Sequence, residues 1–74
     1  MRAPVLLYVT TGCPFCEAKR AELRAAGAVV REVDVGREPQ VIPELLKLTG
    51  GRRVVPVVVS SGRVEIAPAG GSAF

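Results

Sequence analysis

The feature that most constrains this chain is a pair of cysteines, Cys13 and Cys16, set between a strand pattern and a helix pattern. The apolar run 5–9 ends shortly before the pair, and Pro14 suits the first turn of a helix. A helix N-terminus favours a thiolate, so Cys13 can act as a nucleophile. Cys16 lies one turn further on, close enough to attack a mixed disulfide formed on Cys13. We therefore expect Cys13 to be the exposed, more acidic thiol and Cys16 to be largely buried.

Three other interpretations of this Cys-x-x-C spacing stay open. Zinc needs four ligands, so a chain with 2 cysteines and no histidine would need carboxylates or a second chain. A structural disulfide across two intervening residues closes a loop too short to stabilise much. Two buried, inert thiols are the third interpretation. The flanking pattern fits a strand–helix–strand unit, which favours redox chemistry over all three.

At 74 residues the chain is expected to form one domain, residues 1–74, with a dense apolar core, and its hydrophobic content of 49% meets that need. The net charge is only +3, and basic residues alternate with acidic ones, so we expect no nucleic-acid partner. The apolar run 5–9 is too short for a signal peptide or a membrane span. We therefore expect no membrane association and a cytoplasmic location, where a cysteine pair is more often catalytic than structural.

The hydrophobic pattern predicts an α/β chain with the order β-α-β-α-β-β. The expected strands are 5–9, 29–35, 54–59 and 63–67, and the expected helices are 14–26 and 40–48. Strand 5–9 should be central because it is apolar throughout, and strand 29–35 should lie nearer an edge. Pro43 should fall in the first turn of the second helix. Segment 68–74 has no periodicity and is predicted to be a loop or flexible tail.

This order resembles the glutaredoxins of the thioredoxin fold over residues 5–72. Cys13-Pro14-Phe15-Cys16 resembles their Cys-Pro-Tyr-Cys, and segment 50–56 resembles a segment that ends in Thr-Val-Pro. Tyr8 also precedes the cysteine loop, as in many glutaredoxins, and Gly70-Gly71-Ser72 resembles the glycine pair after their hairpin. The resemblance implies a thioredoxin-like, four-stranded mixed sheet, here without the usual C-terminal helix.

The same resemblance implies a thiol–disulfide oxidoreductase in which Cys13 and Cys16 are catalytic. It assigns substrate contacts to Pro14, Phe15, Arg52, Arg53, Val55, Pro56, Gly70, Gly71 and Ser72. It further implies a cis Val55–Pro56 bond that faces the cysteines, so that the backbone of Val55 can pair with an extended thiol peptide. The alternative is an edge-strand proline that only limits ladder pairing.

Three departures from the family pattern bear on glutathione. Thr10 stands where many glutaredoxins have lysine, Val54 replaces the threonine of Thr-Val-Pro, and Ala73 replaces an aspartate that meets the amino group of glutathione. We therefore expect weak glutathione binding. The cations left for its carboxylates are Arg52, Arg53 and Lys47, although Arg52-Arg53 can equally be a solvated turn.

No tightly bound cofactor is expected, and glutathione is a possible co-substrate. The expected partners are a disulfide-containing protein or small molecule, and, as electron donor, glutathione or a flavoprotein like thioredoxin reductase. Two other functional classes stay open: a metal or iron–sulfur module formed by paired chains, and a regulatory domain without activity. Ser72 after the glycines also resembles the place of a cysteine or selenocysteine in some glutaredoxin-like selenoproteins; an ordinary loop serine is the simpler interpretation.

Overall fold

The computed structural model describes residues 4–74. In chain order the elements are β1 (Val5–Val9), α1 (Pro14–Ala25), β2 (Val30–Asp34), the 3₁₀ helix η1 (Pro39–Val41), α2 (Ile42–Thr49), β3 (Val54–Val55), β4 (Val57–Ser60), β5 (Arg63–Ile66) and β6 (Ser72–Ala73). Every helix within residues 4–74 falls short of the length and apolar character that a membrane crossing requires.

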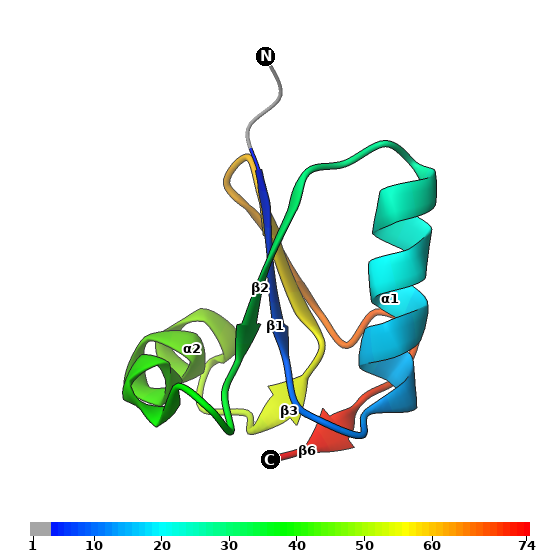
Figure 1. The fold of residues 1–74 in the computed structure, drawn as a ribbon. Coiled ribbons are helices and arrows are strands. Elements are labelled where there is room, and N and C mark those ends of the chain that lie inside the picture. Colours follow the sequence, from blue (N-terminus) through cyan, green and yellow to red (C-terminus); the bar gives the residue numbers. More distant parts are fainter. Residues whose placement is uncertain (1–3) are drawn as a thin grey trace.

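Four strands form a mixed sheet in the order β2-β1-β4-β5. β1 is parallel to β2 and antiparallel to β4, while β4 and β5 form an antiparallel hairpin. α1 lies along one face of this sheet and α2 lies against the other (Figure 1). The central place of β1 and the edge position of β2 are confirmed, and the arrangement is the predicted thioredoxin-like fold.

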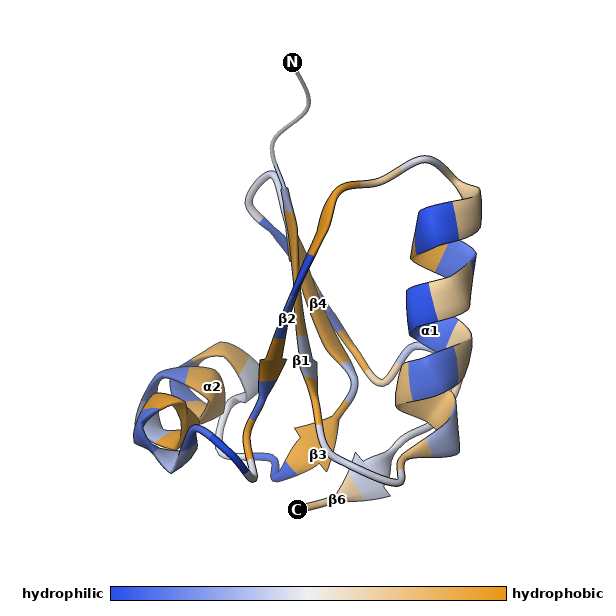
Figure 2. Ribbon diagram, in the orientation of Figure 1, coloured by the Kyte–Doolittle hydropathy of each residue, from blue (hydrophilic) through white to orange (hydrophobic). Residues whose placement is uncertain are grey.

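The core lies between the central strands and the two helices. Leu7 of β1, Val57 of β4 and Leu45 of α2 have no exposed surface. Leu7 pairs with Val58 and Tyr8 pairs with Val57, so neighbouring β1 residues point to opposite faces of the sheet. A helix covers each face of the sheet, which suits the mostly hydrophobic colouring of β1 in Figure 2.

Both ends of α1 have local causes. Pro14 occupies the first turn, where its missing N–H costs no helical hydrogen bond. At the other end, the N–H of Ala28 donates to the carbonyl of Leu23 and the N–H of Gly27 donates to that of Arg24, both at 3.0 Å. These two bonds satisfy carbonyls that the last helical turn leaves free. The predicted end at Gly27 is therefore confirmed.

The second helix begins later than its pattern predicts. Segment 39–41 forms η1, and the α-helix proper begins at Ile42 with Pro43 in its first turn. Pro43 has no N–H to donate to the carbonyl of Pro39, so an α-helix that begins at Gln40 would lose a bond there. The expected place of Pro43 in the first turn is confirmed, while the predicted start at Gln40 is wrong.

Two further predictions, for residues 54–59 and 68–74, are wrong. The predicted single strand 54–59 is divided at Pro56 into β3 and β4, and only β4 joins the main sheet. Segment 68–74, predicted to be a loop or flexible tail, contains β6, which pairs antiparallel with β3. A strand of two residues shows no periodicity in the sequence, and its formation depends on a partner edge that lies far away along the chain.

Candidate active site

The two cysteines are placed by the junction between β1 and α1. Cys13 is the N-cap of α1, with an extended backbone (φ −92°, ψ 108°), and its Sγ accepts a hydrogen bond from the N–H of Cys16 at 3.2 Å. The carbonyl of Cys13 accepts further bonds from the N–H groups of Cys16 and Glu17. Both thiols are free. The sulfur of Cys13 therefore takes the capping position at which a helix favours negative charge.

The predicted exposure of Cys13 is wrong. Cys13 is 2% exposed and Cys16 is 1% exposed, so both side chains belong to the buried core. Cys13 is buried in the same cluster as Val55, and the hydroxyl of Ser72 lies close enough to its sulfur to lower the pKa of Cys13. Sequence reasoning located the helix end correctly but did not anticipate that the strand side would close over it.

The environment of Cys13 favours the thiolate. Burial raises its pKa, but hydrogen bonds from the Cys16 thiol and the Ser72 hydroxyl act in the opposite direction. The backbone N–H groups of Cys16 and Phe15 add to these bonds, and the net result is a pKa below the ordinary value. Cys13 therefore has the lowered pKa expected of a nucleophilic cysteine.

The environment of Cys16 has the opposite effect. Burial, followed by the hydrogen bond that its thiol donates to Cys13, raises the pKa of Cys16 to about 12. The basic residues nearest in sequence do little for Cys13, because Lys19 pairs with Glu22 and Arg20 pairs with Glu32, both at 2.6 Å. The two thiols are thus unequal, with a protonated Cys16 that stabilises a negative Cys13.

The strand side of the site is formed by β3 and β6. The Val55–Pro56 bond is cis, as predicted, and Val55 and Pro56 are buried. Val55 lies opposite Ser72 and Val54 lies opposite Ala73 in the antiparallel pair. The structure thus brings three residues of the expected substrate site, Val55, Pro56 and Ser72, to the side of the molecule where Cys13 is buried.

The glycine pair has a structural explanation in close packing. Gly70 has φ +107°, and a Cβ there would lie 2.9 Å from the ring of Phe15. A Cβ on Gly71 would overlap the carbonyl oxygen of Val55. Gly70 therefore packs under the ring of Phe15, and Gly71 packs against β3. Phe15, with 41% of its surface exposed, covers this turn.

The two arginines assigned to the substrate site from the sequence have different surroundings in the structure. Arg53 donates a hydrogen bond from Nε to the carbonyl oxygen of Phe74 at 2.9 Å, and its guanidinium lies 4.8 Å from the centre of the Phe74 ring. Arg52 is exposed, and its carbonyl accepts a bond from the hydroxyl of Thr49. Arg53 borders a hollow of about 340 Å³ that is lined by Thr10, Val35, Gly36, Pro39, Ile42, Arg53 and Phe74. Arg52 and Lys47 lie outside that lining, and Phe74 is a member that the sequence did not suggest.

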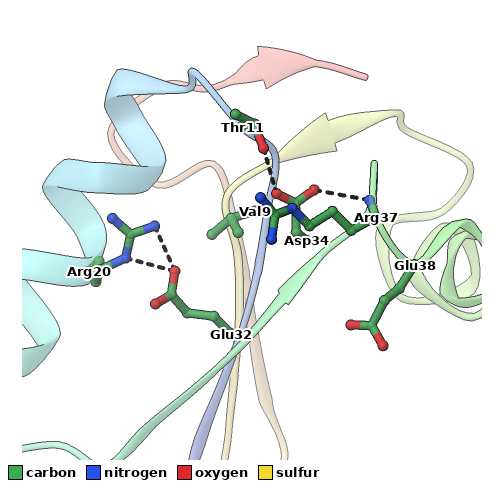
Figure 3. A pocket seen from close by; sticks show the side chains of 7 residues that line it. All are labelled: Val9, Thr11, Arg20, Glu32, Asp34, Arg37 and Glu38. Atoms are coloured by element: carbon green, nitrogen blue, oxygen red, sulfur yellow. Dashed lines mark hydrogen bonds and ion pairs between the residues drawn. The ribbon is translucent and has the colours of Figure 1, made fainter.

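A second hollow, of about 390 Å³, lies beside the cysteine loop (Figure 3). Asp34, at the end of β2, accepts bonds from the hydroxyl of Thr11 at 2.7 Å and from the N–H of Gly36 at 2.9 Å. The bond from Thr11, reinforced by those from Gly36 and Arg37, keeps the pKa of Asp34 below its usual value. The Asp-x-Gly spacing at a strand end was the available signal, because such an aspartate often binds the backbone two residues on. Asp34 therefore ties the cysteine loop to the connection after β2.

Metal coordination within the chain has little support from the side chains. Among residues 4–74, no group of three or more His, Cys, Asp or Glu side chains is arranged to hold a metal ion.

The comparisons with known proteins agree with this geometry. Searches among curated proteins and among solved structures gave no significant match. The family model described as glutaredoxin matches residues 5–65, a range that contains both cysteines and the cis proline but ends before the glycine pair. With most of its length matched, a thioredoxin-like sheet and two unequal thiols at the start of α1, the chain belongs to the glutaredoxin family of thiol oxidoreductases.

Proposed function

We propose that this protein reduces disulfides with the dithiol of Cys13 and Cys16. The main support for the proposal is that, at the N-terminus of α1, the pKa of Cys13 is lowered while the pKa of Cys16 is raised. A lowered pKa increases the fraction of attacking thiolate on Cys13, while a raised pKa keeps the thiol of Cys16 protonated.

The exchange proceeds in two balanced steps. The Cys13 thiolate attacks one sulfur of the substrate disulfide; a bond forms between that sulfur and Cys13, the substrate S–S bond breaks, and the other substrate sulfur leaves as a thiolate. Cys16 then gives its proton to that thiolate and attacks the sulfur of Cys13; the bond between Cys13 and the substrate breaks, and the second substrate sulfur leaves as a thiolate that takes a proton from water. The products are two substrate thiols and a Cys13–Cys16 disulfide, so the substrate gains the two electrons that the protein loses.

The second step is helped by the first. The bond between the Cys16 thiol and Cys13, which raises the pKa of Cys16, requires a negative sulfur on Cys13. Once Cys13 is part of a mixed disulfide, that cause disappears and the pKa of Cys16 falls toward the value that burial alone sets. The pair therefore releases its second thiolate more readily once the substrate is attached, while burial still raises the pKa of Cys16.

The proposed substrates are protein disulfides and mixed disulfides with glutathione. The hollow beside Arg53 offers a guanidinium for a carboxylate, which supports a thiol peptide with an acidic end. Thr10 in the same hollow adds no charge, so glutathione should bind weakly and a flavoprotein reductase remains a second candidate donor.

The test is single-turnover reduction of a fluorescent peptide disulfide by the reduced wild-type protein, by Cys13→Ser and by Cys16→Ser. Cys13→Ser should lose activity by about 10³-fold or more, as expected when a covalent nucleophile is removed. Cys16→Ser should still form a mixed disulfide but should not release its second product. Full activity of Cys13→Ser would contradict the proposal.

Two further arms of this experiment identify the donor. The oxidised protein is mixed with glutathione alone and, separately, with thioredoxin reductase and NADPH, and the appearance of free thiols is followed in stopped flow. Fast reduction by glutathione, reduced in Arg53→Ala and retained in Arg52→Ala, would support the Arg53 hollow as a carboxylate site. Reduction only by the flavoprotein would instead assign the protein a donor of the thioredoxin type.

A further inference from the structure

Residues 70–74 cross the active site as a strap, and this segment occupies the hydrogen-bonding edge of β3. Val55 lies opposite Ser72, and the N–H of Phe74 donates to the carbonyl of Arg53 at 3.3 Å. In an antiparallel ladder, hydrogen-bonded pairs alternate with non-bonded pairs. Since Arg53 and Phe74 form a bonded pair, the next one is Val55 with Ser72.

This assignment matters because Val55 has only one hydrogen-bonding edge. In such a pair each residue uses both its N–H and its C=O toward the same neighbour. An extended peptide that docks on Val55 by strand addition needs those same two groups. Val55 therefore cannot pair with Ser72 and with a substrate peptide at the same time.

The strap is held from both sides of the site. Gly71 is pressed against the carbonyl oxygen of Val55, and Gly70 lies under the ring of Phe15. The ring of Phe74 stacks on the guanidinium of Arg53, and the carbonyl oxygen of Phe74 accepts a hydrogen bond from Arg53 Nε. Beneath this strap the Cys13 side chain is 2% exposed, too little for a substrate disulfide to reach its sulfur.

We propose that the strap is a closed gate on the substrate edge, and that substrates react with a form in which residues 70–74 have left β3. This inference rests on the proposed function and specifies its substrate class: extended peptide disulfides that can offer their own backbone to Val55 in place of Ser72. The apparent affinity for such a substrate equals its intrinsic affinity reduced by the open fraction. Changes that loosen the strap therefore increase both access to Cys13 and peptide reduction.

The contacts that anchor the strap are few. Besides the close packing of the two glycines, the strap is anchored by the two-residue strand β6, by two hydrogen bonds between Phe74 and Arg53, and by one stacking contact at an exposed arginine. Loss of a cation–π contact at such a site changes an equilibrium by roughly two- to fivefold. The open form is thus within reach of a single substitution.

The main test compares Phe74→Ala with Val64→Ala, which removes a half-exposed apolar side chain from β5, away from the strap. Three quantities are measured: hydrogen exchange at the Val55 amide, the alkylation rate of Cys13 by iodoacetamide, and kcat/KM for a peptide disulfide. Alkylation is followed to its plateau at high pH, where the rate reports access to the sulfur rather than its pKa. Phe74→Ala should raise all three by roughly two- to fivefold, and Val64→Ala should change none of them.

A second pair of variants tests the backbone register. Ser72→Pro removes an N–H that faces Val55, whereas Ala73→Pro removes one that faces away from β3, because Val54 and Ala73 form a non-bonded pair. Ser72→Pro should give the larger rise in Val55 exchange and in plateau alkylation. Equal effects of the two prolines would overturn the register on which the gate depends.

The outcomes separate the gate from the proposed function. Faster alkylation and exchange with slower peptide reduction would overturn the gate, since the strap would then be part of the docking surface. Unchanged alkylation and exchange in both Phe74→Ala and Ser72→Pro, in a protein that reduces peptides, would overturn it as well. Absence of peptide reduction in every variant, with the expected rise in alkylation, would overturn the proposed function and leave strap closure standing.

Discussion

The helix half of the site (residues 12–16) and the strand half (β3 with the strap) differ in how far their contacts reach along the chain. In the helix half, the bonds around Cys13 join residues three or four apart. In the strand half, Arg53 bonds to Phe74 across 21 residues, and β6 exists only because β3 lies beside it. A local arrangement forms whenever α1 forms, whereas the strand half also depends on the folding of everything between its two strands.

This difference implies that the two halves of the site have different roles. The helix half sets most of the chemistry of the sulfur, because it provides the cap, the backbone N–H groups and the second thiol, while the strand half adds the Ser72 hydroxyl. The strand half sets access to that sulfur. Substitutions in the strand half should therefore change stability and exposure more than they change the intrinsic reactivity of Cys13.

The largest effect that would test this difference in roles is expected from Gly71→Val. The added side chain overlaps the carbonyl oxygen of Val55, and Val54 and Ala67 also lie too close. Displacement of the strap and of β3 should lower the free energy of unfolding by about 2–4 kcal/mol in urea titrations. Gly50→Ala is the control, since open space surrounds Gly50 and only its left-handed backbone (φ +69°) opposes a side chain. The free energy of unfolding of this control should fall by about 1 kcal/mol. Equal losses of stability in the two variants would show that the surroundings of Gly71 are not tightly packed.

An intermediate effect concerns pH and the helix half. The pKa of Cys16 is raised to about 12 in the folded protein, so its contribution to stability is complete below the ordinary thiol pKa and is lost as the pH rises from about 9 toward 12. The slope can approach about 1.4 kcal/mol per pH unit, the limit for one proton. Denaturant titrations of the wild type and Cys16→Ala between pH 8 and 11 should differ in slope in this direction.

The same reasoning gives the opposite sign for Cys13. Its lowered folded pKa favours the thiolate, so this group adds stability as the pH rises through the folded value toward the ordinary one. This gain builds up between the folded pKa and about pH 9 and is fully present above that pH, so Cys13→Ala should cost most there and least in acid. The same variant should leave the alkaline loss from Cys16 smaller, because the Cys16 thiol then lacks its partner. Parallel pH profiles of the two alanine variants would contradict the unequal roles of the thiols.

The smallest effect concerns Asp34, which provides a long-range contact for the helix half. Asp34→Asn weakens the bonds from Thr11 and Gly36 and should lower stability by about 1 kcal/mol at pH 7, a value reduced for solvent exposure. The folded pKa of Asp34 lies below 3.8, so its stabilisation is present above that value and is lost as the pH falls through the folded pKa. The difference between the two proteins should therefore disappear in acid. A difference that persists unchanged at pH 2 would mean that the charge of Asp34 contributes nothing.

The sequence was informative where the causes are local. The start and end of α1, the first turn of α2, the central place of β1 and the cis Val55–Pro56 bond all match expectation. It failed where one segment must meet another: β6 carries no periodic signal, and the burial of Cys13 comes from a segment almost sixty residues further along the chain. The glycine pair was noticed only by resemblance, and its reason, the ring of Phe15 and the carbonyl of Val55, lies in tertiary packing.

The two outer strands of the sheet carry a consequence for behaviour in solution. β2 exposes Arg31 and Glu32, and β5 exposes Arg63 and Glu65, so each open edge has charges of both signs. Charged side chains on an edge strand disfavour the addition of a strand from a second copy. A chain in which 49% of the residues are hydrophobic is thereby protected from growing into extended sheets.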